Sequence, residues 1–304
     1  MTAPTIGIVS PGAMGSAVGA AYAADGARVV ATVAGRSART RGLAAAAGLE
    51  LLPDLDEVVR HADVVLSIVP PEHALAVAGD IGAAARRADA DPLVVDLNAI
   101  APATARALGL RLAGSGLDVV DGSISGGPPH ADGSTRIYLS GARAAEVAAL
   151  PAPGIDARVV GGQVGLASAV KMSTASVYKG TNALLAHALL SARANGVLEH
   201  VLDDLQDAFP ELLDGVARSL ARSATKAHRY VGEMHEIATS QAEAGLPAEL
   251  FEGFAAAYAA LAETPLGHES PESVAAEVML EDVLAALSAA GAGRAGAAGS
   301  PPDA

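Results

Sequence analysis

Residues 5–24 constrain the fold most strongly, because a short β-rich run (TIGIV) is followed by a glycine-containing turn and then by a helical run of small residues. Strand, turn and helix in this order open a dinucleotide-binding domain. Gly12 and Gly15 have the spacing of the second and third glycines of the fingerprint G-x-G-x-x-G, while Ser10 replaces the first. The helix N-terminus offers N–H groups to a pyrophosphate. The residues expected to contact the cofactor here are Ser10, Gly12, Ala13 and Met14.

The turn after the second predicted strand, residues 28–33, indicates which cofactor binds. NAD is usually held at this point by a carboxylate that accepts from the ribose hydroxyls. No acidic residue lies between Val29 and Gly48, whereas Arg36 and Ser37 offer the charge and hydroxyl that suit a 2′-phosphate. We therefore predict NADP (NADPH) as the cofactor, with Arg36 and Ser37 binding it. The alternative is a solvated loop arginine.

Three further strands are predicted to end at the same edge of the sheet, at residues 63–69, 93–96 and 117–124. Open α/β sheets bind their ligands at the carboxyl ends of such strands. The residues that follow them and are predicted to bind the cofactor are Val69, Pro70 and Asn98. The residues predicted to bind an anionic group of the substrate are Ser125, Gly126 and Gly127, whose alternative is a plain structural turn. Residues 135–140 and 157–160 complete the predicted sheet.

Beyond Gly161 the pattern is helical only, which predicts two domains. We expect an α/β, Rossmann-type doubly wound domain over residues 1–161 and an all-α domain for substrate binding and dimerisation over residues 162–290. The tail, residues 291–304, is rich in Ala, Gly and Pro and is expected to be disordered. The helices predicted after Gly161 are residues 163–195, 198–208, 211–221, 224–244, 247–262 and 273–289.

Charge and cysteine content exclude several classes of function. The formal net charge of −14 disfavours nucleic acid and anionic membranes as partners, because both require a basic face. The absence of cysteine excludes disulfides and thiolate chemistry, and is compatible with the cytoplasm, where we expect the protein to work. No apolar run approaches the ~18 residues that span a bilayer.

Residues 161–180 contain the candidate catalytic side chains. Lys171, Thr174 and Tyr178 recur at helical spacing and would share one face of a long helix. Lys171 lies between Val170 and Met172, so packing against the second domain would desolvate it. Burial and a nearby cation each lower the pKa of an amine, which lets a lysine act as acid or base near neutral pH. The alternative is a snorkelling lysine at a domain seam.

These motifs in this order resemble the β-hydroxyacid dehydrogenase superfamily, and in particular its phosphogluconate-dehydrogenase-like branch. The segments that carry the resemblance are IGIVSPGAMG, SIVPP, DLNAIAP, DGSISGG and GLASAVKMS. The resemblance implies that the Ser125-Gly126-Gly127 turn holds the substrate acid and that Lys171 is the acid/base beside the reacting carbonyl. It also implies a homodimer built around the helical domain, with the active site between domains.

The departures from the family narrow the predicted activity. Thr174 and Ala175 stand where the family has asparagine, and we keep Thr174 as a substrate-binding candidate. Tyr178 stands where the decarboxylating enzymes have glutamate, which argues against 6-phosphogluconate as substrate, although a phenol still donates a proton. We predict NADP-dependent hydride transfer to or from the carbonyl or hydroxyl carbon of a small anionic substrate, with Lys171 and Tyr178 as catalytic residues. The alternatives are an imine reductase, although those usually lack this lysine, and a non-catalytic NADPH-binding dimer that acts as a sensor.

The histidines do not predict a metal site. His228 and His235 are seven residues apart and would share a helical face, but metal binding requires a third ligand in register. A polar surface or dimer face is the interpretation that we favour. His73 and His130 follow sheet-edge turns and receive no role.

Overall fold

The computed structural model describes residues 4–130 and 135–288. The chain divides into two compact units, Met1–Ser173 and Thr174–Ala304. The predicted boundary after residue 161 lies twelve residues earlier than this division and stays a prediction. The predicted disordered tail, residues 291–304, lies outside the described residues.

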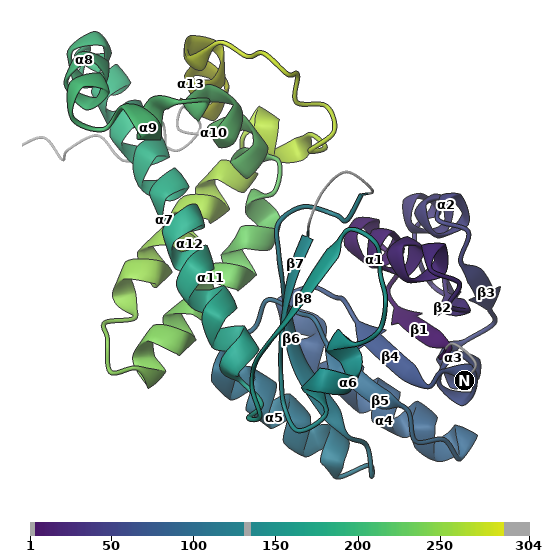
Figure 1. Ribbon diagram of the computed structural model, residues 1–304. Coiled ribbons are helices and arrows are strands. Elements are labelled where there is room, and N and C mark those ends of the chain that lie inside the picture. The colour runs from purple at the N-terminus through teal and green to yellow at the C-terminus, as the bar shows by residue number, and fades with distance from the viewer. Residues whose placement is uncertain (1–3, 131–134, 289–304) are drawn as a thin grey trace, which may run out of the picture. The chain divides into compact units, whose positions relative to one another are not determined.

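One eight-stranded sheet forms the first unit's centre (Figure 1). The strands are β1 Ile6–Val9, β2 Val29–Thr32, β3 Glu50–Leu52, β4 Val64–Ser67, β5 Leu93–Asp96, β6 Val119–Ser125, β7 Thr135–Ser140 and β8 Ile155–Gly161. Their order is β3-β2-β1-β4-β5-β6-β7-β8, and only the β6–β7 pair is antiparallel. Helices connect each of the first five strands to the next, so the predicted doubly wound α/β class is confirmed.

Helices cover both faces of this sheet. They are α1 Ala13–Ala24, α2 Ala38–Ala46, α3 Leu55–His61, the 3₁₀ turn η1 Pro71–His73, α4 Ala74–Ala88, α5 Pro102–Ala113 and α6 Ala144–Ala148. Successive strand residues point to opposite faces, so Ile6 and Ile8 of β1 enter one core while Val9 enters the other. The first core is closed by α1, α2 and α6, and the second by α3, α4 and α5.

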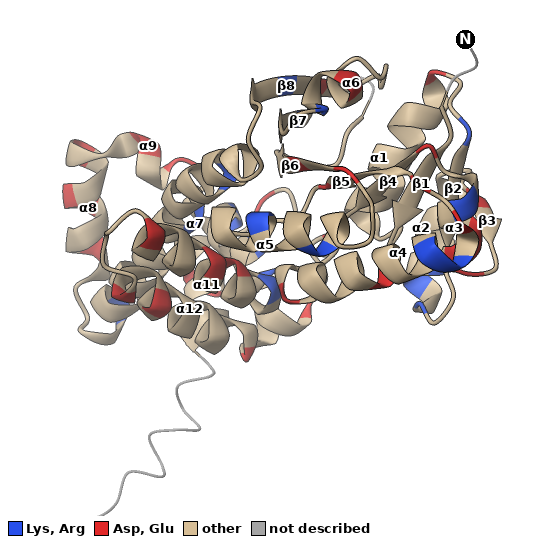
Figure 2. Cartoon of the chain, turned by 90° about the horizontal axis from the view of Figure 1, so that it is seen from below, with Lys and Arg blue, Asp and Glu red and all other residues tan. Residues whose placement is uncertain are grey.

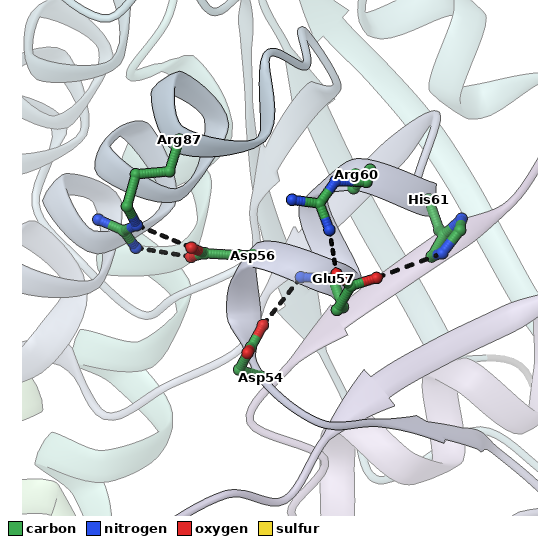
Figure 3. A network of polar contacts seen from close by, with 6 residues as sticks. All are labelled: Asp54, Asp56, Glu57, Arg60, His61 and Arg87. Carbon is green, nitrogen blue, oxygen red and sulfur yellow. Dashed lines mark hydrogen bonds and ion pairs between the residues drawn. The ribbon is translucent and has the colours of Figure 1, made fainter.

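Helix α3 shows how local sequence fixes an element of this layer (Figure 3). Asp54 caps its N-terminus, where Oδ1 accepts from the Glu57 N–H at 3.0 Å. Asp56 in the first turn receives two hydrogen bonds from Arg87 in the last turn of α4, at 2.7 and 2.6 Å. Glu57 in turn pairs with Arg60 and lies 3.5 Å from His61 Nε2. This network ties α3 to α4 on the outside of the sheet.

The second unit contains only helices among its described residues. They are most of α7 Leu166–Ala194, then α8 Leu198–Ala208, α9 Pro210–Leu213, α10 Val216–Ala224, α11 Ala227–Glu243, α12 Glu249–Ala262, the 3₁₀ turn η2 Pro265–His268 and α13 Leu280–Ser288. The single helix predicted over residues 211–221 is wrong, because Gly215 adopts φ 64° and separates α9 from α10. The helix predicted over residues 273–289 begins only at Leu280.

A buried ion pair lies inside this helical unit. Lys179 of α7 pairs with Glu233 of α11, and their side chains are 13% and 9% exposed. The Lys179 amine also lies 4.4 Å from the centre of the Tyr230 ring, which meets Tyr258 edge-on at 5.2 Å. Tyr258 donates to the Lys179 carbonyl at 2.7 Å. Since a buried charge is costly when unpaired, these contacts fix the register of α7 on α11 and α12.

Candidate functional site

Five parallel strands, β1, β2, β4, β5 and β6, end at one edge of the sheet. The connections from β1 lead outward to β2 and β3, whereas those from β4 lead in the other direction to β5 and β6. Ligands of open α/β sheets bind at such a reversal. The turns predicted to bind cofactor and substrate all follow these strands, so the structure gathers them at the edge where a dinucleotide would bind.

The turn after β1 has two geometric features of the dinucleotide fingerprint, a left-handed residue at its first position and a close approach of the helix at its third glycine. Ser10 adopts φ 66°, the left-handed conformation for which the fingerprint uses glycine, and its carbonyl accepts from the Gly12 N–H at 2.8 Å. A Cβ on Gly15 would lie 2.6 Å from the same carbonyl, so helix and turn meet too closely for any side chain there. A Cβ on Gly12 would meet nothing within 4 Å.

The N-terminus of α1 is therefore open to an anion. It has no side-chain cap at Gly12 and no acidic residue in its first turn, which begins with Ala13 and Met14. The helix dipole and the first N–H groups favour a negative charge at this point. The four residues predicted around this turn fit a pyrophosphate, and their contact with it stays a prediction.

The turn after β2 is basic, as Figure 2 shows by the blue segments around α2. Arg36 and Ser37 are both exposed and precede the helix directly. Ser37 caps α2, because its Oγ accepts from the Thr40 N–H at 3.2 Å. The Arg36 carbonyl accepts from Arg41 Nη1. Arg36 thus stands beside an N-terminus whose first turn has no acidic residue, where a phosphate would be stabilised.

The turns after β4 and β5 are joined through Asn98, which is 2% exposed. Asn98 Oδ1 accepts from the Val69 N–H at 2.6 Å, and its Nδ2 donates to Ser67 Oγ at 3.3 Å and to Asp96. The side chain therefore fixes the backbone just before Pro70. Its position supports an indirect role through this turn, and direct contact of Asn98, Val69 or Pro70 with a cofactor stays a prediction.

Lys171 contacts the end of strand β6. Its amine is half-buried and donates to the Ile124 carbonyl at 2.7 Å, directly before Ser125. Gly126 adopts φ 114°, and a Cβ on Gly126 or Gly127 would meet nothing within 4 Å. The predicted acid/base and the predicted anion-binding turn thus lie together within the first unit, with open space beside the glycines.

Asp121, which the sequence analysis did not single out, holds the start of α7. Its carboxylate is 1% exposed and accepts from the Gly165 and Ser168 N–H groups, at 2.9 and 3.1 Å. Ser140 Oγ and Ser168 Oγ also donate to it, at 2.9 and 2.6 Å. The signal available in the sequence was one acidic residue inside an otherwise uncharged strand, followed four residues later by Ser125.

Thr174 and Tyr178 follow Lys171 on α7 but belong to the second unit. Thr174 is half-buried and Tyr178 is 69% exposed. Their predicted parts in substrate binding and proton donation stay predictions.

The histidines have the surroundings of surface residues. His235 Nδ1 lies 2.9 Å from Glu252 Oε2, with both side chains about half exposed, and His228 is exposed. Within residues 4–130 and 135–288, no group of three or more His, Cys, Asp or Glu side chains is arranged to hold a metal ion. In the same ranges, no helix has the length and apolar character needed to cross a membrane.

Comparison with known proteins identifies the family. Residues 5–152 match the NAD binding domain of 6-phosphogluconate dehydrogenase, and residues 192–261 match a domain of unknown function. A conserved protein whose structure is described as similar to 3-hydroxyacid dehydrogenases is 28% identical, with a TM-score of 0.64 over 85% of this chain and 97% of that chain. These matches support the β-hydroxyacid dehydrogenase superfamily as the family of this chain. The matching family and the structural neighbours are NAD(P)-dependent dehydrogenases and reductases.

Two enzymes of known class share the fold at lower identity. The 3-hydroxyisobutyrate dehydrogenase of Mycobacterium tuberculosis is 21% identical, with a TM-score of 0.67 over 90% of this chain and 98% of that chain. An imine reductase from Myxococcus stipitatus, in complex with NADP⁺, is also 21% identical, with a TM-score of 0.54 over 86% of this chain and 93% of that chain. A dehydrogenase and an imine reductase therefore share this fold.

Proposed function

We propose that the protein transfers a hydride between NADP(H) and the carbonyl or hydroxyl carbon of a small anionic substrate. The observation that carries this proposal is the Lys171 amine, 2.7 Å from the Ile124 carbonyl and next to the turn that begins at Ser125. This turn ends a strand at the sheet edge to which the dinucleotide-binding turns also belong. A proton donor and an anion-binding turn beside a nicotinamide are the parts that reduction of a keto acid requires.

The bound nicotinamide supplies the hydride for reduction, or accepts it for oxidation. When hydride reaches a carbonyl carbon, negative charge develops on the oxygen, and the protonated Lys171 amine donates a proton to that oxygen. In the oxidative direction the neutral amine accepts the proton of the hydroxyl group. The Ser125 hydroxyl and the N–H groups of Gly126 and Gly127 orient the substrate's anionic group.

The test is replacement of the lysine. Lys171→Met should lower kcat by roughly 10²–10⁴-fold and leave NADPH affinity nearly unchanged, since a positioned proton donor contributes about that factor. Lys171→Arg keeps the positive charge but cannot release a proton near neutral pH, so it should lose a similar factor. Turnover of the methionine variant equal to that of the wild type would remove Lys171 from this role.

The preference for NADP rests on the turn after β2. Arg36 and Ser37 stand at the start of α2, and no carboxylate lies between Val29 and Gly48 to bind the ribose hydroxyls of NAD. Arg36 suits a 2′-phosphate, because a guanidinium forms paired hydrogen bonds with phosphate oxygens.

The substrate class is tested by following NADPH consumption with small keto acids, semialdehydes and cyclic imines. We expect turnover of the keto acids or semialdehydes. Reduction of cyclic imines alone would replace this proposal by imine reduction, and NADPH binding without turnover across the panel would favour a sensor.

We also propose that the protein acts as a homodimer through its helical unit. Val177 and Leu184 are 64% and 61% exposed and lie seven residues apart on α7, so they share a face. Ala188 and Ser191 continue this face without charge and are also exposed. An uncharged exposed stripe supports association of two copies that otherwise repel each other through their net charge of −14.

A further inference from the structure

Strand β6 contacts the first turn of α7 through Asp121 and Ser123, two alternate residues whose side chains lie on one face of the strand. Asp121 and Ser123 are each 1% exposed. Ser123 Oγ donates to the Ala167 carbonyl at 2.9 Å. Ser125, two residues further on, is the start of the proposed substrate-binding turn. Strand β6 therefore both binds the start of α7 and carries part of the proposed substrate-binding site.

The N–H groups at the start of α7 donate to one buried carboxylate, that of Asp121, and to a neighbouring hydroxyl, that of Ser140. Asp121 Oδ2 accepts from the Gly165 and Ser168 N–H groups, and Ser140 Oγ, which donates to the same oxygen, accepts from the Ala167 N–H at 3.0 Å. The first N–H groups of a helix have no partner within it, and the dipole favours negative charge there. Asp121 thus meets both requirements at once, which offsets the cost of burying its charge.

A second contact connects the same strand to the same helix one turn later. Lys171 follows Ser168 by three residues, so the two side chains lie on neighbouring positions of one helix face. Its amine donates to the carbonyl of Ile124, which follows Asp121 by three residues. The lysine side chain is long and flexible, so the place of its amine depends on where the strand holds the helix backbone.

We propose that Asp121 is a positioning residue, whose carboxylate seats the first turn of α7 on β6 and thereby holds the Lys171 amine beside Ser125. The proposal rests on the proposed function and extends it to a residue that touches neither substrate nor cofactor. A displacement of about 1 Å in a reacting group can cost about 10²-fold in rate. Loosening this seat should therefore lower turnover without weakening NADPH binding.

The test is Asp121→Asn, which keeps the size of the side chain but replaces one acceptor oxygen by an amide donor. That donor faces groups that already donate to Asp121. We expect kcat to fall about 10- to 100-fold, with NADPH affinity within about threefold of wild type. The limb of the pH–rate profile that reports Lys171 should also shift. The matched control is Asp54→Ala, which removes the cap of a remote helix and should lower stability without changing kcat.

A second readout does not depend on activity. The chain has three lysines, Lys171, Lys179 and Lys226, so amine labelling followed by mass spectrometry resolves each one. Asp121→Asn should speed labelling of Lys171 severalfold and leave Lys179 and Lys226 unchanged. If Lys171→Met retains turnover while Asp121→Asn still frees the amine, the proposed function fails and the positioning role stands.

Milder variants cover the case in which Asp121→Asn does not fold. Ser168→Ala removes the 2.6 Å hydrogen bond to Asp121, and Ser140→Ala removes the donor that also caps Ala167. Both should shift kcat and Lys171 labelling in the same direction by a smaller factor. Wild-type kcat and wild-type labelling in variants that lose only thermal stability would overturn the proposal.

Discussion

Arg36 is the residue on which we propose that cofactor choice depends in this protein. It is exposed, precedes the capping Ser37, and stands at a helix N-terminus without acidic neighbours in the first turn. A charge-assisted hydrogen bond contributes about 1.5–3 kcal/mol, or roughly 10- to 100-fold in affinity. NADH has no phosphate at this position and gains nothing from the guanidinium.

We therefore expect Arg36→Ala to weaken the binding of NADPH by roughly 10- to 100-fold and to change the affinity for NADH by less than about twofold. Isothermal titration with both nucleotides measures this. Arg143→Ala is the matched control, because it removes an equal charge from a partly exposed residue at the start of α6 that pairs with Glu146. If Arg36→Ala lowered the affinities for NADPH and NADH equally, Arg36 would not be recognising the 2′-phosphate.

At this scale the sequence predicted types of residue better than their contacts. Ser10, Gly12 and Gly15 were recognisable because the fingerprint is local in the chain. Asp121 was not, because its partners Gly165 and Ser168 lie 44 and 47 residues away and become neighbours only when α7 packs on β6. Lys171 was a candidate from helical spacing and resemblance, whereas its bond to the Ile124 carbonyl required the folded chain.

The hydrogen bonds between Arg87 and Asp56 join helix α4 to helix α3, and they have a measurable effect on the pKa of Asp56 (Figure 3). Hydrogen bonds from Arg87 hold the pKa of Asp56 below its ordinary value, with smaller charge effects from Arg87 and Arg60. A carboxylate whose pKa is lowered by folding contributes stability above its unfolded pKa of about 3.9, and this is lost as pH falls through the folded pKa. These hydrogen bonds should therefore weaken only in acid.

We expect Arg87→Gln to raise the pKa of Asp56 toward its ordinary value, measured by NMR titration of the carboxylate. The variant should also lose less stability than wild type as pH falls below about 4, since the lost contact no longer titrates. Arg60→Gln is the control and should move the Asp56 pKa less, because Arg60 acts only through its more distant charge. An equal shift in both variants would show that the hydrogen bonds are not the main cause.

Elements with strong periodicity were predicted correctly, and weakly patterned ones were missed. Strands β1, β4 and β5 and helix α7 appear close to their expected bounds, because their apolar residues repeat with the periods of strand and helix. Helix α2 was not predicted, since it is rich in arginine and buries only Ala44. Strand β3 has three residues and pairs only with β2, too short a run for a pattern.

For the whole molecule, the order of elements was predictable because strands alternate with helices up to Gly161 and strands then stop. What pattern alone did not supply was the surface through which we propose that copies associate, since a stripe such as Val177 and Leu184 is recognised as exposed only in the folded unit. Burial decides it. The apolar residues of α7 that face inward, such as Leu185 and Leu189, are 7% and 0% exposed.

We expect Leu184→Glu to convert the proposed dimer into a monomer, because it would place a charge of the same sign on both copies where their uncharged stripes would meet. Light scattering coupled to gel filtration measures the mass. Leu110→Glu is the control: Leu110 is 77% exposed but lies on α5 of the first unit, so its replacement should leave the mass unchanged. A wild-type protein of monomer mass would refute dimerisation itself.

The turn after β1 bears on how related chains are found. Serine is accommodated at position 10 in a left-handed conformation, whereas position 15 excludes every side chain, because a Cβ would lie 2.6 Å from the Ser10 carbonyl. A motif search that insists on the first glycine passes over chains built like this one. A search that fixes the third glycine and admits serine at the first would collect them.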